Sequence, residues 1–220
     1  MQFIIERRNY IILILIFILS FWIICLKNDR IFLKSYNFKD KTITIVIYDR
    51  VNVKKVSNEI KKIYKKYEKI KDLSTLNING ELLDKADKMN VIFSFSTNEV
   101  TKYLKKTKIY KYIINADGNI ITGKRYGNDK YNISINDVNS DKVLKIVSLE
   151  NESMVTINNE KYDSLVVIGS DIINTNLVGE AIKSLSVEDG KAIALKYNCE
   201  VLWYFNNKIS LSKNFSKYIV

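Results

Sequence analysis

Alternating stretches of apolar and polar residues predict a domain that contains both strands and helices. Strands are indicated where every second residue is apolar, or where β-branched and aromatic residues form a short run. The segments with this pattern are 42–48, both halves of 112–123, 131–135, 142–149, 154–157, 165–169, 200–205 and 208–211. Asp117-Gly118 divides the segment 112–123, and Asp-Gly between apolar runs is typical of a tight hairpin turn.

Apolar residues spaced three and four positions apart predict helices between these strands. The clearest example is 53–72, where Val56, Ile60 and their neighbours recur at this spacing with lysines between them. Ser96 and Glu99 have the spacing of a capping box, which favours a helix after them. The other predicted elements are an irregular stretch at 73–90, a short apolar run at 91–95, and helices at 97–107, from about 175 to 185, and at 189–197.

These elements predict the α+β class, with a mixed or antiparallel sheet and flanking helices in one domain over residues 41–220. The chain has 220 residues, which is long enough to bury a sizeable core in one such domain.

The N-terminal region contains a run of 17 residues, Tyr10 to Leu26, in which Ser20 is the only clearly polar residue. A helix of this length spans about 25 Å, close to the hydrocarbon thickness of a bilayer. Arg7 and Arg8 precede the run and are expected to stay in the cytoplasm. The sequence therefore predicts a single-pass protein of the cell membrane.

In this topology, residues 1–9 are cytoplasmic, 10–26 are the transmembrane anchor, 27–40 are a juxtamembrane connector, and 41–220 form an extracytoplasmic domain. A cleaved signal peptide is an alternative, although the run is long and no Ala-x-Ala-like site follows it. Lipidation of Cys25 is another alternative, although Trp22-Ile23-Ile24 precedes it where a small residue is usual.

Composition narrows the chemistry. The chain has no His, which excludes a His general base, a Ser-His-Asp triad and His metal ligands. A metal site would have to use oxygen ligands, which suit Mg²⁺ or Ca²⁺. The formal net charge is +11, but the lysines are spread along the chain beside acidic residues. We interpret this charge as a solvated surface, with contact to a nearby lipid surface as the second interpretation, and expect no nucleic acid partner.

The hairpin at Asp117-Gly118 resembles part of a known family. That family has a helix followed by a strand that ends in Gly-Gly-Asp-Ile, and residues 98–120 fit this helix and strand without a gap. Asp117-Gly118 takes the place of the double glycine, and Asn119 takes the place of the Asp. The family's next stretch, a glycine and a strand with Trp-x-Val-x-Ile, is similar to Gly123 and residues 131–135.

A third block extends the resemblance toward the C-terminus. In the family, a strand precedes Ala-Asp-Ala-Leu-Ala-Thr-Ala-Leu and then a glycine-containing turn. Residues 175–182 and Glu188-Asp189-Gly190 resemble these two pieces, and residues 208–215 resemble the family's final strand. In order and spacing, the three blocks resemble the ApbE family of FAD:protein FMN transferases.

The resemblance implies a fold, an activity and a set of site residues. ApbE proteins are membrane-tethered or periplasmic, cleave FAD with Mg²⁺, and attach FMN to a Thr or Ser of a target flavoprotein. By this resemblance, Asp117, Gly118 and Asn119 would contact the FAD cofactor. Asn176 and Glu180 would contact Mg²⁺, because the family places an Asp and a Thr four apart there, on one helix face. The alternative is that Asn176 caps a helix and Glu180 is a surface residue.

Other family motifs are missing. Phe93-Ser94-Phe95-Ser96 replaces the glycine-rich segment Gly-Gly-Ile-Ala-Lys-Gly-Tyr-Ala, with Phe93 in the place of its Lys, and Asn98 replaces an Asp. The loop with His-Ile-Ile-Asp-Pro is deleted. We therefore assign no catalytic residue and predict a catalytically degenerate, membrane-anchored protein with a binding or accessory role in flavoprotein maturation. An active, divergent Mg²⁺-dependent transferase and an unrelated membrane-tethered interaction domain stay open as alternatives.

Overall fold

The computed structural model describes residues 31–70, 73, 82–83, 86–127, 129–137, 140, 142–157 and 159–220. The expected anchor at 10–26 lies outside these residues. Within the part of the chain that is described, no helix is long and apolar enough to cross a bilayer. Residues 32–220 form one compact unit, so the domain begins earlier than the predicted boundary at residue 41.

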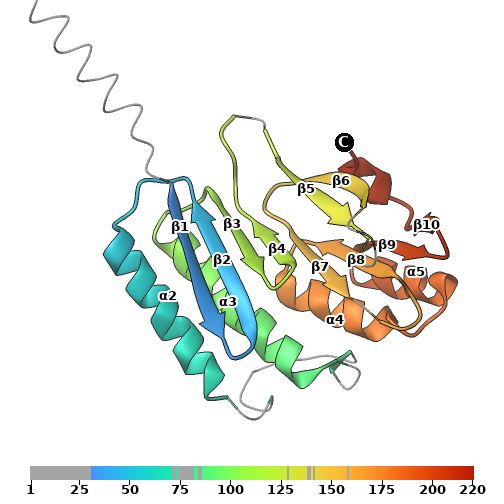
Figure 1. Cartoon of the computed structure of the whole chain (residues 1–220), viewed down its shortest axis with the longest axis horizontal. Helices are drawn as coiled ribbons and strands as arrows, with labels where there is room; N and C mark the ends of the chain where they lie inside the picture. Colours follow the sequence, from blue (N-terminus) through green and yellow to red (C-terminus); the bar gives the residue numbers. More distant parts are fainter. Residues whose placement is uncertain are drawn as a thin grey trace, which may run out of the picture. The chain divides into compact units, whose positions relative to one another are not determined.

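The centre of the domain is an eight-stranded sheet in the order β1-β2-β3-β4-β7-β8-β9-β10 (Figure 1). All neighbouring strands are antiparallel, and β5 and β6 pair as a separate two-stranded sheet. The bounds are β1 Phe32–Phe38, β2 Lys41–Ile47, β3 Tyr112–Ala116, β4 Asn119–Thr122, β5 Tyr131–Asn136, β6 Val143–Leu149, β7 Ser153–Ile157, β8 Ser164–Gly169, β9 Glu200–Phe205 and β10 Lys208–Leu211.

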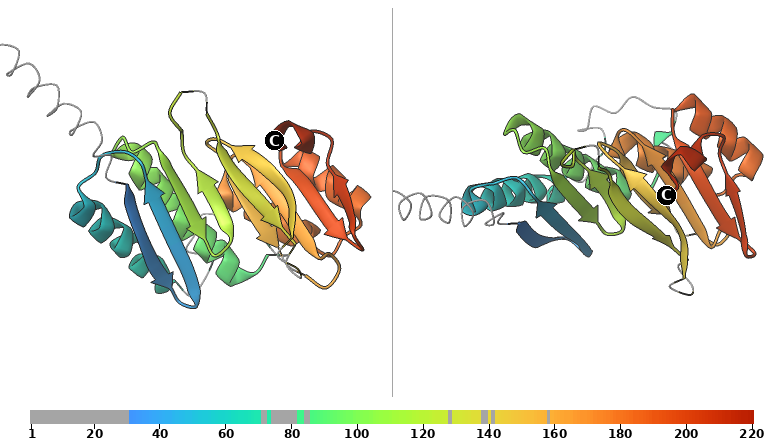
Figure 2. Two further views of the ribbon diagram at one scale, coloured as in Figure 1. Left: turned by 45° about the horizontal axis from the view of Figure 1, so that its top comes forward. Right: turned by 90° about the horizontal axis from the view of Figure 1, so that it is seen from above.

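Four helices, α2 (Val53–Glu68), α3 (Lys88–Lys106), α4 (Ile172–Ile182) and α5 (Val187–Lys196), cover one face of the large sheet (Figure 2). The larger apolar core lies between these helices and the sheet. A smaller core lies on the opposite face, where β5, β6 and the 3-10 helix η3 (Phe215–Tyr218) cover the sheet. The described structure is therefore an α+β domain, and its sheets are antiparallel rather than mixed.

The amphipathic pattern of α2 explains how this helix packs. Val56, Ile60 and Tyr64 are buried against the sheet, whereas the lysines between them are exposed. Asn52 caps the helix, because its side-chain oxygen accepts a hydrogen bond of 3.0 Å from the Lys55 amide. The helix predicted over 53–72 is thus confirmed, with an end at Glu68.

Three predicted boundaries are wrong. Part of the connector 27–40 is β1, an edge strand that buries Phe32, Tyr36 and Phe38. The helix predicted to begin at 97 begins at Lys88, and the apolar run at 91–95 belongs to it. The helix predicted to begin near Thr175 begins at Ile172.

The helix α3 begins early because Asp87 caps it, accepting a hydrogen bond of 2.9 Å from the Asn90 amide. Ser96 does not form the predicted capping box. It lies inside the helix, and its hydroxyl donates to the Phe93 carbonyl at 2.7 Å. The hairpin prediction at Asp117-Gly118 is confirmed, since both residues have positive φ, 54° and 86°, as a type I′ turn requires.

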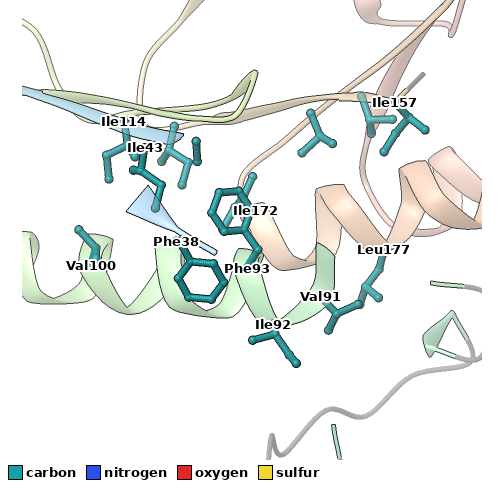
Figure 3. Packing of buried hydrophobic residues seen from close by; sticks show 14 of the residues in the cluster. Phe38, Ile43, Val91, Ile92, Phe93, Val100, Ile114, Ile157, Ile172 and Leu177 are labelled. Carbon is teal, nitrogen blue, oxygen red and sulfur yellow. The ribbon is translucent and has the colours of Figure 1, made fainter. Parts of the chain in front are cut away.

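The larger core is centred on α3. The ring of Phe93 is fully buried, 5.4 Å from the ring of Phe38 between centroids. Figure 3 shows these two rings together with Ile43 and Ile114 of the sheet and Leu177 of α4. The segment 93–96, which the resemblance places at the glycine-rich loop, therefore has a structural role in this chain.

Replacing Phe93 with Ala should lower the free energy of unfolding by about 3–5 kcal/mol, because it removes a buried aromatic ring and leaves a cavity. Urea unfolding followed by tryptophan fluorescence would measure this loss. Leu195→Ala is the matched control, since Leu195 is exposed on α5, and it should change stability by less than about 0.5 kcal/mol. Equal effects of the two substitutions would contradict the packing described here.

Alkaline pH should destabilise the domain partly through Tyr112. Burial raises the pKa of this phenol from 10 to about 12, so the folded state holds the proton more tightly than the unfolded chain. The stabilisation that this raised pKa gives the folded state is complete below pH 10 and is lost as the pH rises through about 12. Tyr112→Phe should therefore lose less unfolding free energy between about pH 8 and pH 11 than the wild type. An identical loss in both proteins would refute this role of Tyr112.

Candidate functional site

The β3–β4 hairpin holds the three residues expected to contact a cofactor. Asn115 stabilises the turn, because its side-chain oxygen accepts a hydrogen bond of 3.0 Å from the Gly118 amide. Asp117 forms an ion pair of 2.9 Å with Lys41 of β2. The Lys41 ammonium also lies 5.2 Å from the centre of the Phe93 ring. The tip of this hairpin is thus fixed to β2 and α3.

A cavity of about 660 Å³ lies against this hairpin. It is on the sheet face that β5 and β6 cover, opposite the helices. Asp117 and Gly118 line it, whereas Asn119 does not. The lining residues are Asn115, Asp117, Gly118, Ile120, Asn132, Ile133, Ser134, Ile135, Asn136, Asp137, Met154 and Thr156.

The charge of this lining does not fit the diphosphate of FAD. The polar groups are amides, hydroxyls and the carboxylates of Asp137 and of Asp117, which is paired with Lys41, and no lysine or arginine is among the described residues that line the cavity. A diphosphate is normally held by cationic side chains or by helix N-termini. The cavity is therefore suited to neutral or cationic polar groups, such as those of a polypeptide.

The two residues expected to contact a metal lie elsewhere, on α4. Asn176 and Glu180 are one helical turn apart, and both are buried, with 2% and 3% of their surface exposed. The expectation that Asn176 is a cap and Glu180 a surface residue is wrong. Asp171 caps α4 instead, accepting from the Ile173 and Asn174 amides at 3.0 Å each.

Protein groups already occupy both oxygens of the Glu180 carboxylate. Oε1 accepts a hydrogen bond of 2.9 Å from the side-chain Nδ2 of Asn90 on α3. Oε2 forms an ion pair with the Lys183 ammonium at 2.7 Å. The Asn176 Oδ1 atom is buried without a hydrogen-bond partner. We call Asn90, Asn176, Glu180 and Lys183 the α3–α4 polar cluster.

The α3–α4 polar cluster does not fit Mg²⁺. This ion requires about six oxygen ligands in near-octahedral geometry. The cluster offers the side-chain amide oxygens of Asn90 and Asn176 and one carboxylate, and that carboxylate is already neutralised by Lys183. Among the described residues, no group of three or more Asp, Glu or Cys side chains could hold a metal ion.

The structure links the two sets of predicted residues through α3: Asp117 pairs with Lys41, whose ammonium lies 5.2 Å from the centre of the Phe93 ring, and Asn90 of the same helix donates to Glu180. The cavity is on one face of the sheet, and α4 packs on the other, where Gly179 lies close against Ile157 of β7. Sequence reasoning missed Asn90 and Lys183 as partners of Glu180. The three-residue spacing of Lys183 could have revealed its pairing, but nothing in the sequence linked Glu180 to Asn90.

The arrangement of the sheet, its helices and the separate β5–β6 hairpin has clear counterparts among solved structures. A mutant of the flavin transferase ApbE from Vibrio cholerae matches with a TM-score of 0.70 over 86% of this chain and 99% of that chain, at 11% identity. The apo flavinyl transferase ApbE from Pseudomonas stutzeri matches with a TM-score of 0.69 over 87% and 98%, also at 11% identity.

The ApbE protein of Thermotoga maritima matches with a TM-score of 0.62 and 10% identity over 86% of this chain and 99% of that chain. The domain has an ApbE-like fold. No protein-family model matches the sequence, and comparison with curated proteins gives no match. At this level of identity, the likeness establishes the ApbE-like fold, while the activity has to be argued from the residues of this chain.

Within the ApbE-like fold, Lys183 should stabilise the α3–α4 polar cluster. Lys183→Met leaves the buried Glu180 carboxylate with Asn90 as its remaining partner and should cost about 1–3 kcal/mol of unfolding free energy. Lys191→Met is the control, because Lys191 forms a pair of the same spacing with Glu188, which is 79% exposed. That substitution should cost less than about 0.5 kcal/mol. Equal losses in urea unfolding would show that Lys183 does not compensate a buried charge.

Proposed function

We propose that this protein is a membrane-anchored, ApbE-like protein without FAD:protein FMN transferase activity, and that it has a binding, accessory role in flavoprotein maturation. The main observation that supports a loss of activity is that other protein groups bind the Glu180 carboxylate. This carboxylate, at the position where the resemblance implies a Mg²⁺ ligand, is bound by Lys183 and Asn90. A metal would have to displace an internal cation to reach it.

The path of α3 supports the same conclusion. A glycine-rich segment lets the backbone approach a dinucleotide closely. Here the segment 93–96 is the interior of an α-helix, and Phe93 is buried in the core. The amide groups of a helix interior are used within the helix, and the N-terminus of α3 is capped by Asp87. This segment therefore presents neither free amides nor a lysine to a phosphate group.

The binding role is supported by the cavity and by an adjacent strand edge. β4 pairs with β7 at Ser153 and Met154 only, so residues 155–157 of β7 pair with β8 on one side and have no described strand on the other. An extended segment of a partner protein can bind at such an edge through its backbone. The amides and hydroxyls of the cavity would then contact its side chains, and we propose that a flavoprotein is this partner.

The membrane anchor is supported by the sequence. The apolar run at 10–26 and the preceding Arg7 and Arg8 favour a single span with residues 27–220 outside the cytoplasm. An anchored binding domain would hold its partner near the bilayer at a high effective concentration.

A second candidate function is an active, divergent transferase. It is favoured by one observation, the buried and unpartnered Asn176 Oδ1 one turn from Glu180. In this case Asn176 and Glu180 would be ligands of Mg²⁺ after Lys183 turned away.

An assay of FAD cleavage separates the two candidates. The full chain in detergent is incubated with FAD and Mg²⁺, and FMN and AMP are measured by chromatography, with an established ApbE transferase as the positive control. We expect no product above the protein-free background, either in the wild type or in Lys183→Met. Turnover by the wild type that Glu180→Ala abolishes would overturn the proposed loss of activity and establish the divergent transferase.

A further inference from the structure

Several chain segments lie beside the start of β1, at one end of the large sheet. In the strand register, Phe32 of β1 is opposite Ile47 of β2, and Ile47 is opposite Tyr112 of β3. A backbone hydrogen bond of 2.7 Å joins the Lys124 amide to the Tyr110 carbonyl at this end. The starts of β1 and α2, the end of α3, and the loop after β4 therefore lie together (Figure 1). We call this the β1 end of the domain.

Exposed apolar and aromatic side chains concentrate at the β1 end. Of the ten large hydrophobic residues that are exposed in the described part of the chain, four belong to the domain and are located there. They are Leu33, Val53, Tyr110 and Tyr126. A cluster of exposed apolar side chains on a protein surface often marks a site of contact with a membrane or with another protein.

Basic residues surround these apolar side chains. They are Arg50, Lys54, Lys55, Lys105, Lys106, Lys108, Lys111, Lys124, Arg125 and Lys130. The acidic residues at the same end are Asp49, Asp129, Glu150, Glu152 and Asp171, the last of which lines one pocket with Lys105 and Glu152. The Asp49 carboxylate already accepts hydrogen bonds from the Tyr110 and Lys111 amides, at 2.6 and 2.8 Å. The β1 end therefore combines an excess of positive charge with exposed apolar groups.

The length of the chain before β1 limits how far this end can be from a bilayer. In the proposed topology the apolar run ends at Leu26, and the domain begins at Phe32. The five residues 27–31 reach at most about 18 Å when fully extended. The tether therefore keeps the start of β1 within roughly two screening lengths of the bilayer, and rotation of the domain about it can bring the charges of this end to the headgroups.

We propose that the β1 end lies on the surface of an anionic bilayer, an inference that rests on the anchor in the proposed function. Its tyrosines and aliphatic residues would occupy the interfacial region, where aromatic side chains are enriched. Its lysines and arginines would contact lipid phosphates, each contributing about 1 kcal/mol near an anionic surface. Lysine stems can extend across apolar surface while the ammonium reaches the headgroups.

Hydrogen exchange on the full chain in nanodiscs tests this surface. Nanodiscs of zwitterionic lipid are compared with nanodiscs that contain a large fraction of anionic lipid. We expect at least a threefold slowing of exchange in the anionic discs for the loops at 48–52, 107–111 and 123–127, reversed by high salt. Residues 39–41 and 116–119, at the hairpin turns of the opposite end, should exchange equally in both lipids.

Charge reversal gives the matched control. Lys54→Glu/Lys55→Glu should abolish the slowing in anionic discs, whereas Lys65→Glu/Lys66→Glu, at the other end of the same helix α2, should keep it. Both pairs change the net charge equally, and circular dichroism would verify that both variants are folded. Slowing that is absent in the wild type, or lost equally in both variants, overturns the proposal.

The anchor itself is tested separately by flotation of the full chain with vesicles. A chain that floats in zwitterionic and anionic vesicles alike but shows no difference in exchange retains the anchor and refutes the lipid-facing surface. A chain that floats with neither type of vesicle refutes the anchor, and with it the surface.

Discussion

Burial of α3 against the sheet is the constraint on which the rest of the molecule depends. Phe93 of α3 is buried between the sheet and the helices, where its ring lies 5.4 Å from that of Phe38 of β1. A fully buried aromatic ring contributes about 3–5 kcal/mol by the cost of its truncation, a large share of the stability of a typical domain. Burial of Phe93 therefore requires the backbone around it to be helical. This backbone cannot adopt the conformation of a glycine-rich loop.

The position of α3 also determines the state of the α3–α4 polar cluster. Because α3 begins at Lys88, Asn90 is carried to the surface of α4 and donates to Glu180. The partly exposed Lys183 supplies the compensating charge from the same helix as Glu180. Burying a carboxylate is costly without such partners. The contacts with Asn90 and Lys183 make Glu180, which has the spacing expected of a metal ligand, part of an internal ion pair.

The strands and the hairpin were predictable because their signals are local. The alternation around Asp117-Gly118 fixes both the turn and the register of β3 against β4. The start of α3 was missed because Ser94, Ser96 and Thr97 interrupt its apolar periodicity, although they are buried. β1 was missed because Lys34 interrupts its alternation.

The environment of Glu180 could not be predicted from the sequence, because Asn90 is 90 residues away in the chain. Helical spacing placed Asn176 and Glu180 correctly on one face, but spacing alone does not show whether that face is buried.

The antiparallel sheet also relates the proposed lipid-facing end to the cavity. β3 runs from Tyr112, at the β1 end, to Ala116, next to the hairpin turn. The cavity is lined by that turn and by Asn136 and Asp137 at the far end of β5. The four residue steps of β3 separate the two ends by about 14 Å. With the β1 end on the bilayer, the hairpin turn and the Asn136 and Asp137 part of the cavity lie at the end of the sheet that is farther from the lipid. A partner's extended segment could reach this part without crossing the headgroup layer.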